Sequence, residues 1–456
     1  MADETMTLAR YVAGLEATAI PKPVIERAKH LMLDLIGSAT RARAEADSTP
    51  SIINALARIG LGGEGHATVM GDPQLRSPFA AAMLNGALGH SLDFDDTHAA
   101  SSLHPSAPVV PAALAAAETI GATGSQTIAA IVAGYEVCCR IGLAIDPTAH
   151  YARGFHPTAT AGTFGAAAAA GSVLGLTVEQ LVSAFGIGGS QAAGSLQFLS
   201  NGAWNKRLQV GAAAANGLMA AFLAKEGFRG ADAALEGTHG FLQGYSDCGD
   251  PARLTAGLEV VFETLEIGVK PYPGCRYTHA AVDAILALRQ QHAIDPGDVE
   301  WIRIGLHRNG VKLVGTPLAD KRRPRNVVDA QFSMPFAAAL ALSSGKLEWD
   351  DYQRLGNPQL EMLCDRVEVR QSDPVERASK HPFGADVEIG TRHGTYRRGQ
   401  VDPAGEPESF PTSDFLLQKF LTLARPVLRD RATDLAEFLL TIEARDDLRG
   451  LQAARS

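Results

Sequence analysis

Residues 158–174 read TATAGTFGAAAAAGSVL, a stretch in which most side chains are a hydrogen, a methyl group or a small hydroxyl. Small side chains let helices approach closely, so this composition predicts a helix buried at the centre of a helical domain. Further segments combine Ala and Gly with apolar residues at helical spacing, namely 78–90, 107–120, 126–145, 178–199 and 209–226. We therefore expect helix after helix from residue 8 to about residue 260.

The pattern changes near Leu265. LEIGVK (265–270) and VEWIRIGLH (299–307) read as strands, and residues 275–293 between them read as a helix. Residues 385–401, ADVEIGTRHGTYRRGQV, alternate like antiparallel strands around a turn.

We therefore predict a mainly α fold with a large all-helical domain and a smaller α+β domain. The predicted boundaries are 1–265 for the helical domain, 406–456 for the C-terminal helices that complete it, and 266–405 for the α+β domain.

The composition excludes several classes of protein. A net charge of −9 argues against a nucleic-acid partner, which would need a basic face to neutralise phosphates. The apolar stretches are too weakly hydrophobic for us to expect a membrane span. The five cysteines show neither zinc-ligand nor disulfide spacing, and the N-terminus lacks the layout of a signal peptide. We expect a cytoplasmic enzyme or binding protein.

The loop SLDFDDTHAASSLHPS (91–106) gathers carboxylates and histidines between two apolar segments. Such groups can orient an imidazole or accept a proton. Two alternatives are helix capping and a metal site built from Asp93, Asp96 and His98. The loop has no recognised metal-ligand spacing.

Three further motifs carry candidate residues. His156, in GFHPTAT, precedes a helix and lies near exposed backbone N–H groups, although a lone histidine is often a packing residue. Lys206, in NGAWNKRLQVG, precedes a helix of small residues and is either exposed or aimed into a cavity. In KPYPGCRYTH, Lys270 and Arg276 either bind a ligand or are ordinary loop and cap residues.

Two motifs are dismissed. Residues 60–65, GLGGEG, match a dinucleotide-binding pattern but follow a helix and precede a strand, the reverse of the required order. Cys275 has no neighbouring motif that would make it a nucleophile.

The ordered series of motifs resembles the MmgE/PrpD family. The resemblance lies in four stretches that together cover nearly the whole chain: NGALGHSLDFDDTH…HPS (85–106), GFHPTATAGTFGAAAAA (154–170), GSLQFL through WNKRLQVGAAAANG (194–217) and KPYPGCRYTHAAVDA (270–284).

The resemblance implies a large helical domain, a smaller α+β domain and a homodimer. It also implies proton transfer beside a carboxylate of a small polycarboxylate, without a metal or an organic cofactor. Members include 2-methylcitrate dehydratase, cis-aconitate decarboxylase and iminodisuccinate epimerase.

Carried over position by position, the resemblance implies a set of site residues. Histidines with a pKa near neutral pH would move the α-proton, an aspartate would hold one imidazole, and lysines together with an arginine would bind carboxylates. The residues implied as catalytic are His104, His156, Asp93 and Lys206, and those implied as substrate-binding are Thr97, Lys270, Arg276 and again Lys206.

Two positions depart from the family pattern. Cys275 stands where decarboxylase-type members carry a histidine, and Phe336 stands where several members carry a tyrosine. Losing two proton donors makes cis-aconitate decarboxylation a weaker prediction. We expect a hydro-lyase, with epimerisation as the alternative, followed by decarboxylation, a non-catalytic member of the family and a metal-dependent lyase.

Overall fold

The computed structural model describes residues 3–378 and 382–456. The chain divides into two compact units, Met1–Val269 with Thr412–Ser456, and Lys270–Pro411. These boundaries lie a few residues from the predicted ones. The predicted mainly α architecture is confirmed: the first unit is almost wholly helical, and the second packs helices on a small sheet.

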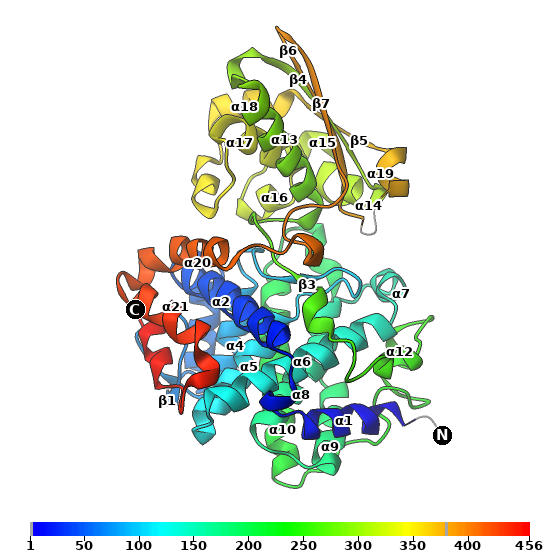
Figure 1. Cartoon of the computed structure of the whole chain (residues 1–456), viewed down its shortest axis with the longest axis vertical. Coiled ribbons are helices and arrows are strands. Elements are labelled where there is room, and N and C mark those ends of the chain that lie inside the picture. The colour runs from blue at the N-terminus through cyan, green and yellow to red at the C-terminus, as the bar shows by residue number, and fades with distance from the viewer. Residues whose placement is uncertain (1–2, 379–381) are drawn as a thin grey trace. The chain divides into compact units, whose positions relative to one another are not determined.

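The helices of the first unit come from both ends of the chain (Figure 1). They are α1 (Glu4–Gly14), α2 (Lys22–Glu45), α3 (Thr49–Arg58), α4 (Pro78–Gly89), α5 (Ser106–Ile120), α6 (Gly124–Ala144), α7 (Pro147–Ala152), α8 (Pro157–Val173), α9 (Val178–Gly189), α10 (Asn205–Lys225), α11 (Phe241–Tyr245), α12 (Ala252–Thr255), α20 (Ser413–Leu428) and α21 (Arg431–Leu440). The short strands of this unit are β1 (Glu64–Ala67), β2 (Thr97–His98) and β3 (Ile267–Gly268).

Helix α8 is the centre of this unit. It packs against α5, α6, α9 and α10, and nearly all its residues from Pro157 to Val173 are buried. A helix buried on every side must present small residues to several neighbours, which explains its run of Ala and Gly.

Glycines mark the closest helix crossings. A Cβ atom on Gly165 of α8 would lie 2.6 Å from Cβ of Cys138 on α6. A Cβ atom on Gly211 of α10 would lie 2.3 Å from the backbone oxygen of Met83 on α4. Real Cβ atoms do not approach this closely, so these crossings require glycine.

The C-terminal helices complete the first unit, because α20 packs along α2 although the two are far apart in sequence (Figure 1). Buried Lys419 of α20 lies with Nζ 2.5 Å from a carboxylate oxygen of Asp34 on α2. The same ammonium donates a 2.9 Å hydrogen bond to the backbone oxygen of Phe94. The C-terminal segment thereby supports the polar loop that follows α4.

Helix α9 is shorter than the predicted 178–199, because it ends at Gly189. The chain beyond it pairs with the segment before α8: Phe155 and Ser195 form an antiparallel bridge. Backbone hydrogen bonds between distant segments replace helical ones here, which local periodicity does not reveal.

The second unit is an α+β unit around a four-stranded sheet of order β5-β4-β6-β7. Strand β4 pairs in parallel with β5 and antiparallel with β6, which forms a hairpin with β7. The strands are β4 (Val299–Leu306), β5 (Val367–Gln371), β6 (Ala385–Thr391) and β7 (Gly394–Gln400). The helices are α13 (His279–His292), α14 (Arg308–Gly310), α15 (Leu318–Arg322), α16 (Val327–Gln331), α17 (Met334–Ser344), α18 (Pro358–Asp365) and α19 (Asp373–Ala378).

The strand predicted at 265–270 is placed differently. It is reduced to β3, which pairs antiparallel with β2 inside the first unit and does not join the four-stranded sheet. Its partner β2 lies within the polar loop 91–106. The sequence of this loop has no strand-like alternation, so only a loop was predicted there.

Helix α6 is the one described helix long and apolar enough to cross a membrane, with a mean hydropathy of 1.5 over its most apolar window. It is 94% buried inside the protein over that window and packs against α8, as the core helix of a soluble protein does.

Replacing Gly211 with alanine tests the close crossing of α4 and α10. The new methyl group would overlap the backbone of Met83, so we expect the free energy of unfolding to fall by about 1–3 kcal/mol. Thermal unfolding followed by circular dichroism measures the change. Gly244→Ala is the control, since its new methyl group meets nothing within 4 Å. Equal midpoints of thermal unfolding for the two variants would contradict a crossing that requires glycine at position 211.

Candidate active site

Residues 90–105 form the loop between α4 and α5, and two contacts hold it in place. Thr97 pairs with Gly268 in the β2–β3 ladder. The backbone N–H of His98 donates a 2.9 Å hydrogen bond to the oxygen of Leu103. These contacts give the loop side chains defined positions.

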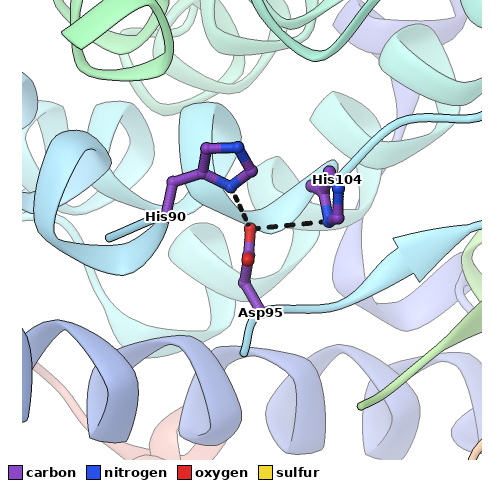
Figure 2. A group of neighbouring side chains, drawn as sticks. All are labelled: His90, Asp95 and His104. Atoms are coloured by element: carbon purple, nitrogen blue, oxygen red, sulfur yellow. Dashed lines mark hydrogen bonds and ion pairs between the residues drawn. The ribbon is translucent and has the colours of Figure 1, made fainter. Parts of the chain in front are cut away.

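Two imidazoles of this loop meet the carboxylate of Asp95 (Figure 2). Nδ1 of His90 lies 2.6 Å from Oδ2 of Asp95, and Nδ1 of His104 lies 3.7 Å from the same oxygen. The side chains of His90 and Asp95 are fully buried, whereas that of His104 is 16% exposed. His104 is therefore the member of this cluster that solvent can reach.

Hydrogen-bond partners define which ring nitrogens carry protons. Nδ1 of His104 lies 2.6 Å from the backbone oxygen of Asp96, and a carbonyl oxygen can only accept. His104 therefore carries its proton on Nδ1, which makes Nε2 the basic nitrogen of the neutral ring. The carboxylate of Asp95 likewise accepts from Nδ1 of His90, so this nitrogen also carries a proton.

The third imidazole belongs to His156, the residue directly before α8. Its backbone N–H donates to the oxygen of Gly194 (3.0 Å), and its ring lies against Phe198. Nδ1 lies 3.2 Å from Oε1 of Gln209, whose amide nitrogen donates to the oxygen of Ser195 (2.9 Å). That second bond orients the amide, so its oxygen accepts from Nδ1–H and leaves Nε2 as the base.

His156 is held in its neutral form. Burial lowers the pKa of this imidazole well below its usual value, and the nearby His90 and Lys206 lower it further. The rings of His90 and His156 lie 5.9 Å apart between centroids, and those of His90 and His104 lie 4.8 Å apart. His104 and His156 thus flank a common neighbour and belong to one cluster.

Lys206, near the start of α10, brings a positive charge to this cluster. Its Nζ lies 2.6 Å from Oδ1 of Asp93, and its side chain is 18% exposed. Asp93 adopts a left-handed backbone conformation with φ of 51°. That unusual backbone turns the carboxylate toward α10, and it is sustained only because the surrounding contacts compensate for it.

Asp96 is a buried carboxyl of the loop that bonds to Ser106, the first residue of α5. It accepts a 3.3 Å hydrogen bond from the N–H of Ser106 and a shorter one from its hydroxyl, which in turn lies 2.6 Å from the hydroxyl of Tyr135. Burial, and then the neighbouring Asp95, raise the pKa of Asp96 well above its usual value. This network anchors the loop that carries His104.

Asp93 differs from its predicted role. We expected it to hold one imidazole, but it forms the ion pair with Lys206, and the carboxylate bonded to an imidazole is that of Asp95. The spacing of three aspartates within four positions could not distinguish them, because turn geometry decides where each one points.

Thr97 lies in the same loop. Among the described residues, buried Oγ1 of Thr97 and buried Oδ1 of Asp95 have no hydrogen-bond partner. Both atoms therefore have unused hydrogen-bonding capacity.

The remaining candidates belong to the second unit, so their action on this cluster stays a prediction. Lys270 is buried at its start. Arg276 is also buried. Its Nη2 lies 2.6 Å from Oε1 of Glu406, so a carboxylate of the protein already pairs with this guanidinium. Cys275 and Phe336 both pack in the hydrophobic core of this unit.

The side chains of the metal alternative have separate partners. Asp93 pairs with Lys206 and Asp96 with Ser106. His98 uses Nδ1 toward Ser101 (2.7 Å) and Nε2 toward Glu263 (3.2 Å). A different set, His90, Asp95 and His104, lies close enough for a shared ion. Nδ1 of His104 faces the backbone oxygen of Asp96, so only Nε2 of this ring could serve as a metal ligand.

Sequence reasoning missed His90, Asp95 as an imidazole partner, and Gln209. His90 ends the quoted motif NGALGH and directly follows a buried helix, which was a usable signal. Gln209 carried no signal, because its importance comes from contacts with His156 and Ser195 in distant segments.

Fold and site together define a two-unit, mainly α protein with a buried imidazole cluster in its helical unit. The model of the MmgE/PrpD N-terminal domain matches residues 6–253, and that of the MmgE/PrpD C-terminal domain matches residues 272–442. The chain belongs to the MmgE/PrpD family.

Curated relatives match most of the chain. The cis-aconitate decarboxylase of Aspergillus terreus is 28% identical over 97% of this chain and 94% of its own length. The cis-aconitate decarboxylase-like protein oryM of Aspergillus oryzae is 28% identical over 98% and 96%, respectively. The cis-aconitate decarboxylase of Homo sapiens is 29% identical over 80% and 76%. A decarboxylase is a lyase, so this chain is similar to enzymes that act on a small carboxylic acid.

The neutral state of His156 predicts a pH-dependent stability. Its pKa is lowered in the folded protein, so the unfolded chain takes up a proton first as pH falls below about 6.5. Stability contributed by neutral His156 is therefore present above that pH and is lost as pH falls toward the folded pKa. We expect His156→Gln to flatten this part of the stability curve, measured by thermal unfolding at a series of pH values.

The matched control is His239→Gln, which removes an exposed histidine of the same unit. An unchanged slope in the His156 variant, equal to that of this control, would contradict a buried neutral imidazole.

Proposed function

We propose that this protein is a cofactor-independent lyase that moves a proton at the carbon next to a carboxylate of a small di- or tricarboxylic acid, with dehydration as the outcome. The observation that carries the proposal is the cluster of His104 and His156 around His90, in which defined hydrogen bonds leave Nε2 as the basic nitrogen. A base and an acid within one cluster are what an elimination requires.

The steps balance without an external reactant. One imidazole removes the α-proton, and the electron pair of that C–H bond forms an enediolate with the adjacent carboxylate. The electrons then form the C=C bond as the β-hydroxyl leaves with a proton from the second imidazole, as water. Lys206 binds a carboxylate of the substrate and stabilises the charge of the enediolate.

Decarboxylation is the second candidate, and the relatives named above favour it. In a decarboxylation the bond between the carboxylate and its neighbouring carbon breaks and CO₂ leaves. One of the same imidazoles then protonates the resulting carbanion. Cys275 and Phe336, in place of a family histidine and tyrosine, support dehydration over this outcome.

Epimerisation would use the two imidazoles on opposite faces of one carbon.

We also propose a cytoplasmic homodimer. All five cysteines are free, as is usual in a reducing compartment. Light scattering of the purified protein would report the mass of the assembly.

Incubation in D₂O with a panel of citrate-, malate-, aconitate- and aspartate-like acids tests the proposal. We expect NMR to show exchange of an α-proton for deuterium with at least one acid, and His156→Ala to slow it by about 100-fold or more. Production of CO₂ would select the second candidate. If no acid exchanges and none is consumed, the proposed chemistry is wrong.

Replacing Lys206 with methionine tests the role of its charge. Losing a charge-assisted bond to a carboxylate should raise KM by about tenfold or more. Lys225→Met is the control, because this exposed lysine lies at the other end of α10. Steady-state kinetics on the acid identified above measures both variants, and a KM equal to that of the control would remove Lys206 from substrate binding.

A further inference from the structure

His90 is the buried centre of the histidine cluster. It directly follows α4, its side chain is fully buried, and its ring lies between those of His104 and His156. Figure 2 shows its Nδ1 directed at Asp95, whose carboxylate also approaches His104. Because solvent does not reach it, we do not assign it a contact with substrate.

The two outer imidazoles lie in different electrostatic surroundings. Oδ2 of Asp95 lies 3.7 Å from Nδ1 of His104, and a carboxylate at this distance favours the protonated imidazolium. His156 instead faces His90 and Lys206, and positive charge on either of them opposes its protonation. The carboxylate of Asp95 thus favours protonation of His104. Positive charge on His90 or Lys206 opposes protonation of His156.

We propose that the His90–Asp95 pair divides the proton transfer, making His104 the general acid and His156 the general base. This inference rests on the proposed function for its chemistry, and His90 acts in it as a positioning residue. Environments that separate two titrating groups are how enzymes obtain an acid and a base from one residue type. The α-proton then goes to Nε2 of His156, and the leaving hydroxyl takes its proton from His104.

Other titratable groups lie near the cluster and are unchanged in the test below. They are Asp93 and Asp96 of the loop, Asp34 of α2, Tyr135 of α6, His150 of α7, Lys206 of α10 and Lys419 of α20. Asp34 raises the pKa of Asp96, burial and Asp95 having larger effects, and His150 has a small effect on His156.

The test is an NMR titration of the His156 imidazole in the full-length wild-type protein and in His90→Gln. His90→Gln removes the positive charge that His90 carries when it is protonated, which should raise the pKa of His156, although burial will still hold that pKa below its usual value. His98→Gln is the matched control, because His98 is a buried histidine of the same loop with its own partners, Ser101 and Glu263. We expect this control to leave the His156 titration unchanged.

The pH profile of kcat/KM is the second readout. A raised His156 pKa should shift the acid limb of the profile to higher pH in His90→Gln, with a loss in kcat of about tenfold or more. Asp95→Asn keeps an acceptor for His90 but removes the carboxylate, so His104 should lose its proton at lower pH and the basic limb should shift to lower pH. If His90→Gln does not fold, the shift of the basic limb in Asp95→Asn tests the proposed division of roles.

The outcomes separate the two proposals. If the variants fold, keep the wild-type His156 titration and show an unchanged pH profile, the division of roles is wrong. The proposed function would still stand if the wild-type protein exchanges an α-proton for deuterium. If the wild type exchanges no proton of any acid, the proposed function fails, and the titration alone still decides whether His90 controls the protonation of His156.

Discussion

The carboxylate of Asp95 is the constraint on which the site depends. A buried charge is costly unless it is paired and hydrogen-bonded, and the contacts that do this for Asp95 among the described residues are those with the imidazoles of His90 and His104. Those contacts require the loop after α4 to keep one conformation. The β2–β3 ladder and the bond from Lys419 to Phe94 supply that restraint.

The packing of small residues explains how the site forms at all. His90 follows α4, His156 precedes α8, and Lys206 lies in the first turn of α10. These helix ends converge because glycines such as Gly165 and Gly211 let the helices cross at distances that any larger residue would prevent. The Ala- and Gly-rich sequence is therefore a requirement of the site as well as of the core.

Much of the fold follows from periodicity, and the exceptions have a common cause. The buried helices and the β6–β7 hairpin were predictable, because apolar spacing and turn residues are local signals. The early end of α9 and the pairing of β3 with β2 were not, because each depends on hydrogen bonds between distant segments. For the same reason the types of residue at the site could be predicted from the resemblance, whereas the exchange of roles between Asp93 and Asp95 required the geometry.

Fixed hydrogen bonds place a proton on Nδ1 of each of the three imidazoles. Nitrogen-15 NMR of histidine-labelled protein near neutral pH, assigned with single His→Gln variants, measures which ring nitrogen carries the proton. We expect a proton on Nδ1 of His104 and of His156, since a backbone carbonyl and an oriented amide oxygen accept from them. Signals of the Nε2–H tautomer at these two residues would contradict it.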